Sequence, residues 1–208
     1  MNLDLTDYTK FFIAMIAIVD PLAILPIYGR LINSFDNIDK KRLARRAAFA
    51  TTSALIVALF FGESILSFFG ISLASFRIAG GGLLMIMALQ MMYENPISER
   101  SVNPENINAI DSQVVVPIAI PLLAGPGAFS TVIVFSFRDD SWAHYALMTA
   151  ALIVIGLIIW LSLHMAGRIL ERVGQTTIAI TNKVMGLIMA AIGVEFIANG
   201  IRQLILAN

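Results

Sequence analysis

The chain has 208 residues, of which 58% are hydrophobic and 13% are charged. Soluble domains average about 45–50% and about 25%, so this composition disfavours a soluble enzyme and excludes a disordered chain. The 14 basic and 14 acidic residues cancel, which gives no sign of a nucleic-acid surface. The absence of cysteine excludes disulfides and thiolate chemistry. His144 and His164 stand alone, so we expect no metal and no cofactor.

Long apolar runs dominate the chain and predict an all-α membrane protein. Runs of about 18 or more mostly apolar residues are typical of transmembrane helices, whereas a membrane barrel would show alternating strands of ~10 residues. The six runs predict six transmembrane helices, over Phe11–Ile32, Ala47–Phe69, Ile71–Met92, Val114–Phe137, Trp142–Met165 and Ile178–Leu206.

The distribution of lysine and arginine predicts the orientation of these helices, because cytoplasmic loops are enriched in both. Ten of the 14 basic residues fall on one side of the predicted bundle and four on the other. We therefore expect a multi-pass protein of the cytoplasmic (inner) membrane with both termini outside the cytoplasm. The lipid bilayer is its expected surroundings, and no oligomeric state is predicted.

An internal repeat is indicated when the chain is shifted by 105 residues. Asp20-Pro21 then falls on Gly125-Pro126, and Gly81 falls on Gly186. Three helices in each half would place the halves in opposite senses, as in the inverted repeats of many secondary transporters. We predict a first three-helix repeat over residues 1–92, a polar cytoplasmic linker over 93–113 and a second, inverted repeat over 114–208.

Proline and glycine interrupt the first and fourth predicted helices at matching positions near the bilayer midplane. Proline removes a backbone donor, so broken helices free carbonyls before the break and amides after it, where the positive helix end favours an anion. Such a centre suits a small zwitterion, although proline kinks that serve only helix packing are the alternative. The predicted substrate-binding residues are Asp20, Pro21, Leu22, Ala23, Pro26, Gly125, Pro126 and Gly127.

Two acids near the midplane are candidates for coupling transport to protons, Asp20 and Glu195. An acid inside a membrane costs about 2.5–3.5 kcal/mol at a helix centre, which makes a functional role the default hypothesis. Asp20 would bind a substrate amine, carry a proton or cap the helix after Pro21. For Glu195, a buried hydrogen-bonding role is the alternative to proton coupling.

Other polar and small residues receive structural interpretations. Glu63 and Arg77 lie seven residues on either side of Gly70, the expected turn between the second and third helices, and we predict that they pair. Gly80–Gly82 and the spaced Gly186, Ala190 and Gly193 predict closely packed helix faces. We expect no enzyme activity, because Ser130 is not in a nucleophile-elbow motif and Asp20 has no second intramembrane aspartate beside it. Besides a transporter and an enzyme, a channel or an assembly subunit is a third class of function.

Several segments resemble the MarC family of six-helix integral membrane proteins, which are also described as neutral amino acid transporters. They are Ile18-Val-Asp-Pro-Leu-Ala-Ile-Leu-Pro26, Phe69-Gly-Ile-Ser, Phe76-Arg-Ile-Ala-Gly-Gly-Gly-Leu-Leu, Val116-Pro-Ile-Ala-Ile-Pro-Leu-Leu-Ala-Gly-Pro-Gly-Ala-Phe-Ser130 and Asn182-Lys-Val-Met-Gly-Leu.

This resemblance implies a lysine-exporter-like fold of two inverted three-helix halves, with broken first and fourth helices around the substrate. It further implies transport of small neutral amino acids such as glycine and alanine, coupled to protons. By position, Asp20, Pro21, Gly125, Pro126 and Gly127 would frame that site. We do not predict drug efflux; export of another small metabolite on the same scaffold is the alternative function.

Overall fold

The computed structural model describes residues 5–25, 28, 39–93 and 124–206, and these residues are helical apart from short connections. No strand occurs within those ranges. The helices, in chain order, are α1 (Leu5–Val19), α3 (Lys40–Phe68), α4 (Leu73–Tyr93), α6 (Pro126–Ser136), α7 (Trp142–His164) and α8 (Ala166–Leu206).

Four of the helices contain segments long and apolar enough to cross a membrane. These candidate spans are Lys40–Phe68, Leu73–Tyr93, Trp142–His164 and Thr177–Leu206. They correspond to the second, third, fifth and sixth predicted spans. The 15 residues of α1 and the 11 of α6 rise only about 22 and about 16 Å at 1.5 Å per residue, so neither crosses a hydrocarbon core of ~30 Å.

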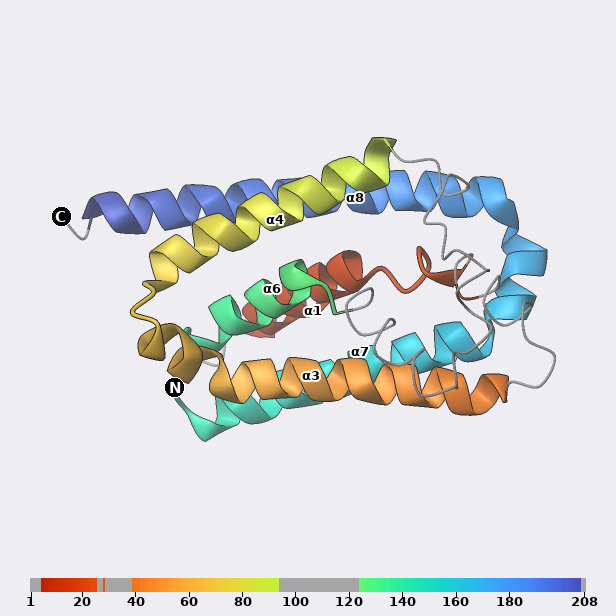
Figure 1. Ribbon diagram of the computed structural model, residues 1–208, viewed down its shortest axis with the longest axis horizontal. Helices are drawn as coiled ribbons and strands as arrows, with labels where there is room; N and C mark the ends of the chain where they lie inside the picture. Colours follow the sequence, from red (N-terminus) through yellow and green to blue (C-terminus); the bar gives the residue numbers. More distant parts are fainter. Residues whose placement is uncertain (1–4, 26–27, 29–38, 94–123, 207–208) are drawn as a thin grey trace.

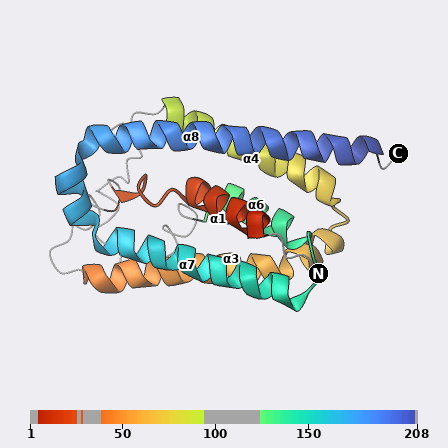
Figure 2. The ribbon, with the colours of Figure 1, turned by 180° about the vertical axis from the view of Figure 1, so that it is seen from behind.

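The helices form three layers (Figure 1). α4 and α8 lie side by side along one edge, α3 and α7 along the opposite edge, and the short helices α1 and α6 lie between these pairs. The same order is visible from behind (Figure 2). The start of α1, the end of α8 and the α3–α4 turn lie at one end of the bundle, which we call the N/C end. The start of α3 and the ends of α4 and α7 lie at the other.

The turn between α3 and α4 has the geometry that glycine permits. Gly70 has a φ of +64°, and the Ile71 amide donates to the Leu66 carbonyl over 2.9 Å. This left-handed residue ends α3 as a helix-terminating glycine commonly does. The expected turn at Gly70 is therefore confirmed.

The predicted pairing of Glu63 with Arg77 is not formed. The ion pairs among the described residues join Asp7 to Lys10 and Asp7 to Arg138. The Glu63 side chain is exposed, and the buried Nε of Arg77 has no hydrogen-bond partner within the described part of the chain. The reason is that α3 and α4 diverge from their turn and α6 packs against both, so residues at equal distances from Gly70 are not neighbours.

α4 and α8 run antiparallel with their backbones in contact. A Cβ atom added to Gly81 would lie 2.6 Å from the Gly193 carbonyl oxygen, and one added to Gly193 would lie 2.8 Å from that of Gly81. Small residues let membrane helices approach this closely. The same register places Gly186 against Ala88 and Gly200 against Ala74, every seventh residue along both helices.

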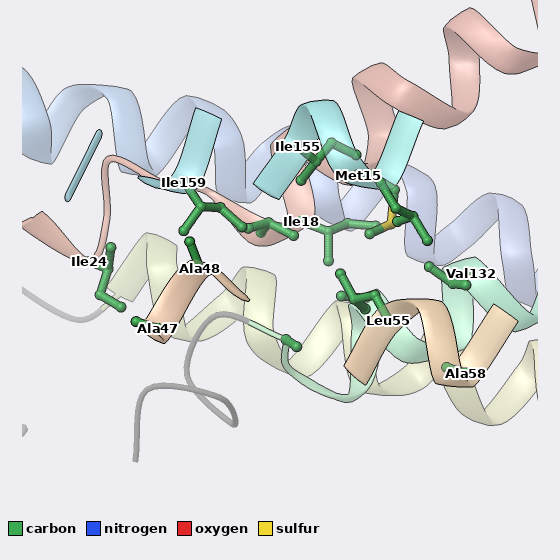
Figure 3. Packing of buried hydrophobic residues seen from close by; sticks show 14 of the residues in the cluster. Met15, Ile18, Ile24, Ala47, Ala48, Leu55, Ala58, Val132, Ile155 and Ile159 are labelled. Carbon is green, nitrogen blue, oxygen red and sulfur yellow. The ribbon is translucent and has the colours of Figure 1, made fainter. Parts of the chain in front are cut away.

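The hydrophobic core lies between the short helices and the α3–α7 pair. Figure 3 shows Met15 and Ile18 of α1, Leu55 of α3 and Ile155 of α7 pointing toward one another. Met15, Leu55 and Ile155 are each at most 1% exposed. α3 and α7 also contact each other directly, because a Cβ on Gly156 would collide with the Thr52 side chain.

Neighbouring glycines on α4 provide a matched test of the α4–α8 contact. We expect Gly81→Ala to destabilise the protein by about 1–3 kcal/mol, because the added methyl overpacks the contact with the Gly193 backbone. Gly82→Ala has open space and should leave the stability unchanged or raise it by up to about 1 kcal/mol through helix propensity. Thermal unfolding in detergent measures both; equal midpoints for the two variants would contradict the close contact.

Candidate functional site

The first break lies directly after α1. Asp20 has a φ of +34°, the single positive value among the described non-glycine residues. Its amide still donates to the Ile16 carbonyl, over 3.0 Å, so Asp20 is the last residue of the regular hydrogen-bonding pattern. Pro21 follows, and it cannot continue that pattern because it has no amide hydrogen. A left-handed aspartate before a proline is a strained backbone of the kind that collects at functional sites.

The two carboxyl oxygens of Asp20 lie in different environments. Oδ1 accepts the amides of Leu22 and Ala23, each over 3.3 Å, in the manner of a helix cap. Oδ2 is buried and has no hydrogen-bond partner in the part of the chain that the structure describes. The whole residue is 5% exposed. The capping role is thus observed for one oxygen, and the other has no partner among the described residues.

The chain regains helical hydrogen bonding one turn beyond the break. The Ala23 amide donates to the Asp20 carbonyl over 3.1 Å, and the Tyr28 amide donates to the Ile24 carbonyl over 2.8 Å. Pro21 is buried, and Leu22 and Ala23 are half-buried. The sequence prediction of a break at Asp20-Pro21 is therefore correct. Pro26, also predicted to contact substrate, lies outside the described residues.

The second predicted break coincides with the start of α6. Gly125 is the N-cap residue, with extended backbone angles and no side-chain cap, and Pro126 is the first helical residue. The amides of Ala128 and Phe129 donate to the Gly125 carbonyl over 2.9 and 3.2 Å. The Gly127 amide has no acceptor among the described residues. Residues 114–123, the first half of the fourth predicted span, lie outside the described part.

The two breaks are neighbours because α1 and α6 pack antiparallel. The rings of Phe11 and Phe135 are 5.0 Å apart near one end of this pair. Near the other end, a Cβ on Gly127 would lie 3.5 Å from Ile18 Cγ2 and would collide with Leu84 of α4. The negative end of α1 and the positive end of α6 thus meet in the middle layer of the bundle (Figure 1).

A buried hydroxyl lies one turn into α6. Ser130 is 2% exposed, its Oγ has no hydrogen-bond partner within the described ranges, and it packs directly over Gly80 of α4. No base contacts this hydroxyl within the described ranges. It is an unused polar group close to the start of α6.

Glu195 does not join this centre. It lies exposed on α8, and its Oε1 accepts a hydrogen bond from Asn199 Nδ2 over 2.8 Å. The α8 residues facing α4 are instead Gly193, Phe196 and Gly200. The sequence could not give the direction of Glu195 around the helix.

A second polar centre, at the N/C end of the bundle, was not singled out from the sequence. His144 of α7 is 3% exposed, with Nε2 3.1 Å from the Phe135 carbonyl oxygen and Nδ1 2.8 Å from the Tyr8 hydroxyl. A carbonyl only accepts, so Nε2 donates to Phe135. His144 thereby joins α1, α6 and α7. A histidine near the start of an apolar span was the available signal.

Charged side chains surround this histidine junction. Arg138 Nη1 lies 2.7 Å from Asp7 Oδ2 and stacks on the Phe135 ring at 4.3 Å. In the α6–α7 connection, the amide and hydroxyl of Ser141 both donate to Asp139 over 3.0 Å. These hydrogen bonds hold the pKa of the Asp139 carboxyl below its usual range. The start of α1 is therefore tied to the end of α6 by polar contacts on several sides.

Comparison with known proteins assigns the chain to a family. Residues 5–205 match the family described as MarC family integral membrane protein. The chain belongs to the MarC family. The resemblance seen in the Asp-Pro and Ala-Gly-Pro-Gly segments is thus confirmed over nearly the whole chain.

Relatives occur in bacteria and archaea, and each is named a membrane protein. One from Buchnera aphidicola of Acyrthosiphon pisum is 38% identical over 201 residues, covering 95% of this chain and 93% of the relative. YhcE of Escherichia coli is 34% identical, covering 96% and 94%. A relative from Methanocaldococcus jannaschii is 34% identical, covering 98% and 100%. No solved structure matches the chain.

The two histidines of α7 provide a matched test of the histidine junction. We expect His144→Ala to destabilise the protein by about 2 kcal/mol or more, because the Tyr8 hydroxyl and Phe135 carbonyl lose their shared partner. His164→Ala removes an exposed ring that only stacks on Trp160, and it should cost about 1 kcal/mol or less. Thermal unfolding in detergent compares them; similar losses would show that the junction adds nothing.

Proposed function

We propose that this MarC-family membrane protein is a secondary transporter of small neutral amino acids of the glycine and alanine type. The observation that carries the proposal is the meeting of two helix ends in the middle layer, beside a buried carboxylate oxygen of Asp20 that has no partner among the described residues. Buried polar groups are normally partnered. An unpartnered buried oxygen at a strained break is best explained by a ligand.

The groups at the two breaks match the two charges of a zwitterion. An ammonium group would bind Asp20 Oδ2 and the partial negative charge at the end of α1. A carboxylate would accept from the Gly127 amide at the positive end of α6. Ile18 and Leu84 pack closely around Gly127, which favours a substrate with a small side chain.

An inverted repeat with alternating access is the transport mechanism that we propose. In its support, the shift of 105 residues relates Gly81 to Gly186 and Ala88 to Gly193, and these residues form the paired contacts Gly81–Gly193 and Ala88–Gly186. A two-fold relation between the halves requires such an exchange of contacts. The antiparallel α3–α7 and α4–α8 pairs would then be matching walls around the broken helices.

The proposal includes proton coupling through Asp20 and a cytoplasmic-membrane location with both termini outside. A single carboxyl that binds the substrate ammonium when ionised and releases it when protonated would link the two fluxes. Glu195 is a weaker candidate, because it points away from the break. Export of another small metabolite by the same architecture is the second candidate, since the helix ends recognise charge rather than a particular side chain. Enzyme activity is not part of the proposal.

Two capping aspartates allow a matched test of the proposed site. Asp20→Asn keeps a capping oxygen for the Leu22 and Ala23 amides but removes the negative charge. We expect it to reduce counterflow of labelled glycine or alanine in proteoliposomes at least tenfold, with thermal stability retained. Asp39→Asn makes the same change at the exposed cap of α3 and should transport as the wild type does.

The result is informative in each direction. Wild-type counterflow in Asp20→Asn would remove the Asp20 charge from the mechanism. If another small metabolite shows counterflow and glycine and alanine show none, the proposed substrate class is wrong, but the proposed site is retained. A panel at two pH values tests the coupling: loss of pH dependence in Asp20→Asn is expected, and its persistence would assign coupling elsewhere.

A further inference from the structure

Basic side chains gather at the end of the bundle opposite the N/C end. Figures 1 and 2 place the starts of α3 and α8 together at this end. The exposed basic residues of these two helix starts, which we call the basic band, are Lys40, Lys41, Arg42, Arg45, Arg168 and Arg172.

The basic band lies at the depth of the membrane surface. The candidate span of α3 begins at Lys40, and its buried residues begin at Leu43. At the same end, Tyr93 closes α4 at 83% exposure and Trp160 lies near the end of α7 at 36%. Exposed tyrosine and tryptophan are enriched at the membrane–water interface. The cations are therefore placed where lipid headgroups lie.

The side chains that the structure describes form no ion pair with the band. Both ion pairs among them involve Asp7, at the N/C end. Asp39, the carboxylate that precedes Lys40, uses Oδ1 to cap the amides of Lys41 and Arg42, each over 3.1 Å. Lys41 and Arg45 repel each other as like charges one turn apart, and cations in a first helical turn also oppose the helix dipole. An external anion would relieve both effects.

We propose that the basic band binds the headgroups of anionic phospholipids. Arg45 and Phe49 lie one turn apart on the same exposed face of α3, and Phe49 is 73% exposed. Arg45 would bind the lipid phosphate, and Phe49, one turn further toward the bilayer, would contact the acyl chain. A soluble phosphate would use the charges alone, and it would leave Phe49 without a role.

The test measures lipid binding to the detergent-purified full chain by native mass spectrometry. Phosphatidylglycerol is titrated against phosphatidylcholine. Each basic residue near an anionic surface contributes about fivefold to binding, so the double variant Lys41→Gln/Arg45→Gln should bind phosphatidylglycerol about 25-fold more weakly. Lys10→Gln/Arg202→Gln removes the same charge from exposed residues at the N/C end and should bind as the wild type does.

Each further outcome supports or overturns the proposal. Arg45→Lys should retain binding, and Phe49→Ala should weaken phosphatidylglycerol binding without changing that of glycerol phosphate. Equal affinity for the two lipids, wild-type affinity in the double variant, or glycerol phosphate binding as tightly as the lipid would each overturn it. The assay involves no transport, so its result is independent of the proposed function.

Discussion

Backbone hydrogen bonding inside a membrane is the constraint on which this structure depends. With no water in the hydrocarbon region, each amide and carbonyl needs a partner within the protein. The chain departs from continuous helix between Asp20 and Ile24, and it satisfies the exposed amides there with one carboxylate oxygen. This irregular segment is tolerated because Asp20, Pro21 and Ile24 are buried within the protein, in the layer between two pairs of long helices (Figure 1). The position of the break and the layering of the bundle therefore both follow from the need to satisfy backbone groups inside the membrane.

The long helices supply a frame against which the short ones are held. Direct backbone contact between Gly81 and Gly193 fixes α4 against α8, and such contacts replace the hydrophobic effect, which does not drive association within lipid. At the N/C end, His144 and the Asp7–Arg138 ion pair hold the start of α1 against α6 and α7. The short helices are thus anchored by polar contacts at their outer ends, while polar groups at the inner ends have no partner among the described residues.

Hydropathy and proline positions in the sequence predicted four long apolar helices, the end of α1 before Pro21 and the start of α6 at Pro126, because hydropathy reports helix length and proline reports where a helix cannot continue. They could not predict which way each helix faces. A membrane helix is apolar on its lipid side as well as its protein side, so it lacks the periodic signal that orients a helix in a soluble protein. This explains why Glu63 and Arg77 do not pair, why Glu195 faces outward, and why His144 was not recognised as the link between three helices. The end of α1 beside Asp20 follows from Pro21, which does not depend on the direction of a helix face.

The divided carboxylate of Asp20 connects the fold to the proposed chemistry. A group that served only to bind substrate would leave the break unsatisfied whenever the site was empty. A group that served only as a cap would not require a buried second oxygen, since the exposed Asp39 caps α3 with one oxygen and leaves its charge near the surface. Asp20 combines both conditions: Oδ1 keeps the broken helix folded, and Oδ2 keeps a buried acceptor available at the meeting of the helix ends. Loss of charge at this position would therefore affect ligand binding more than folding.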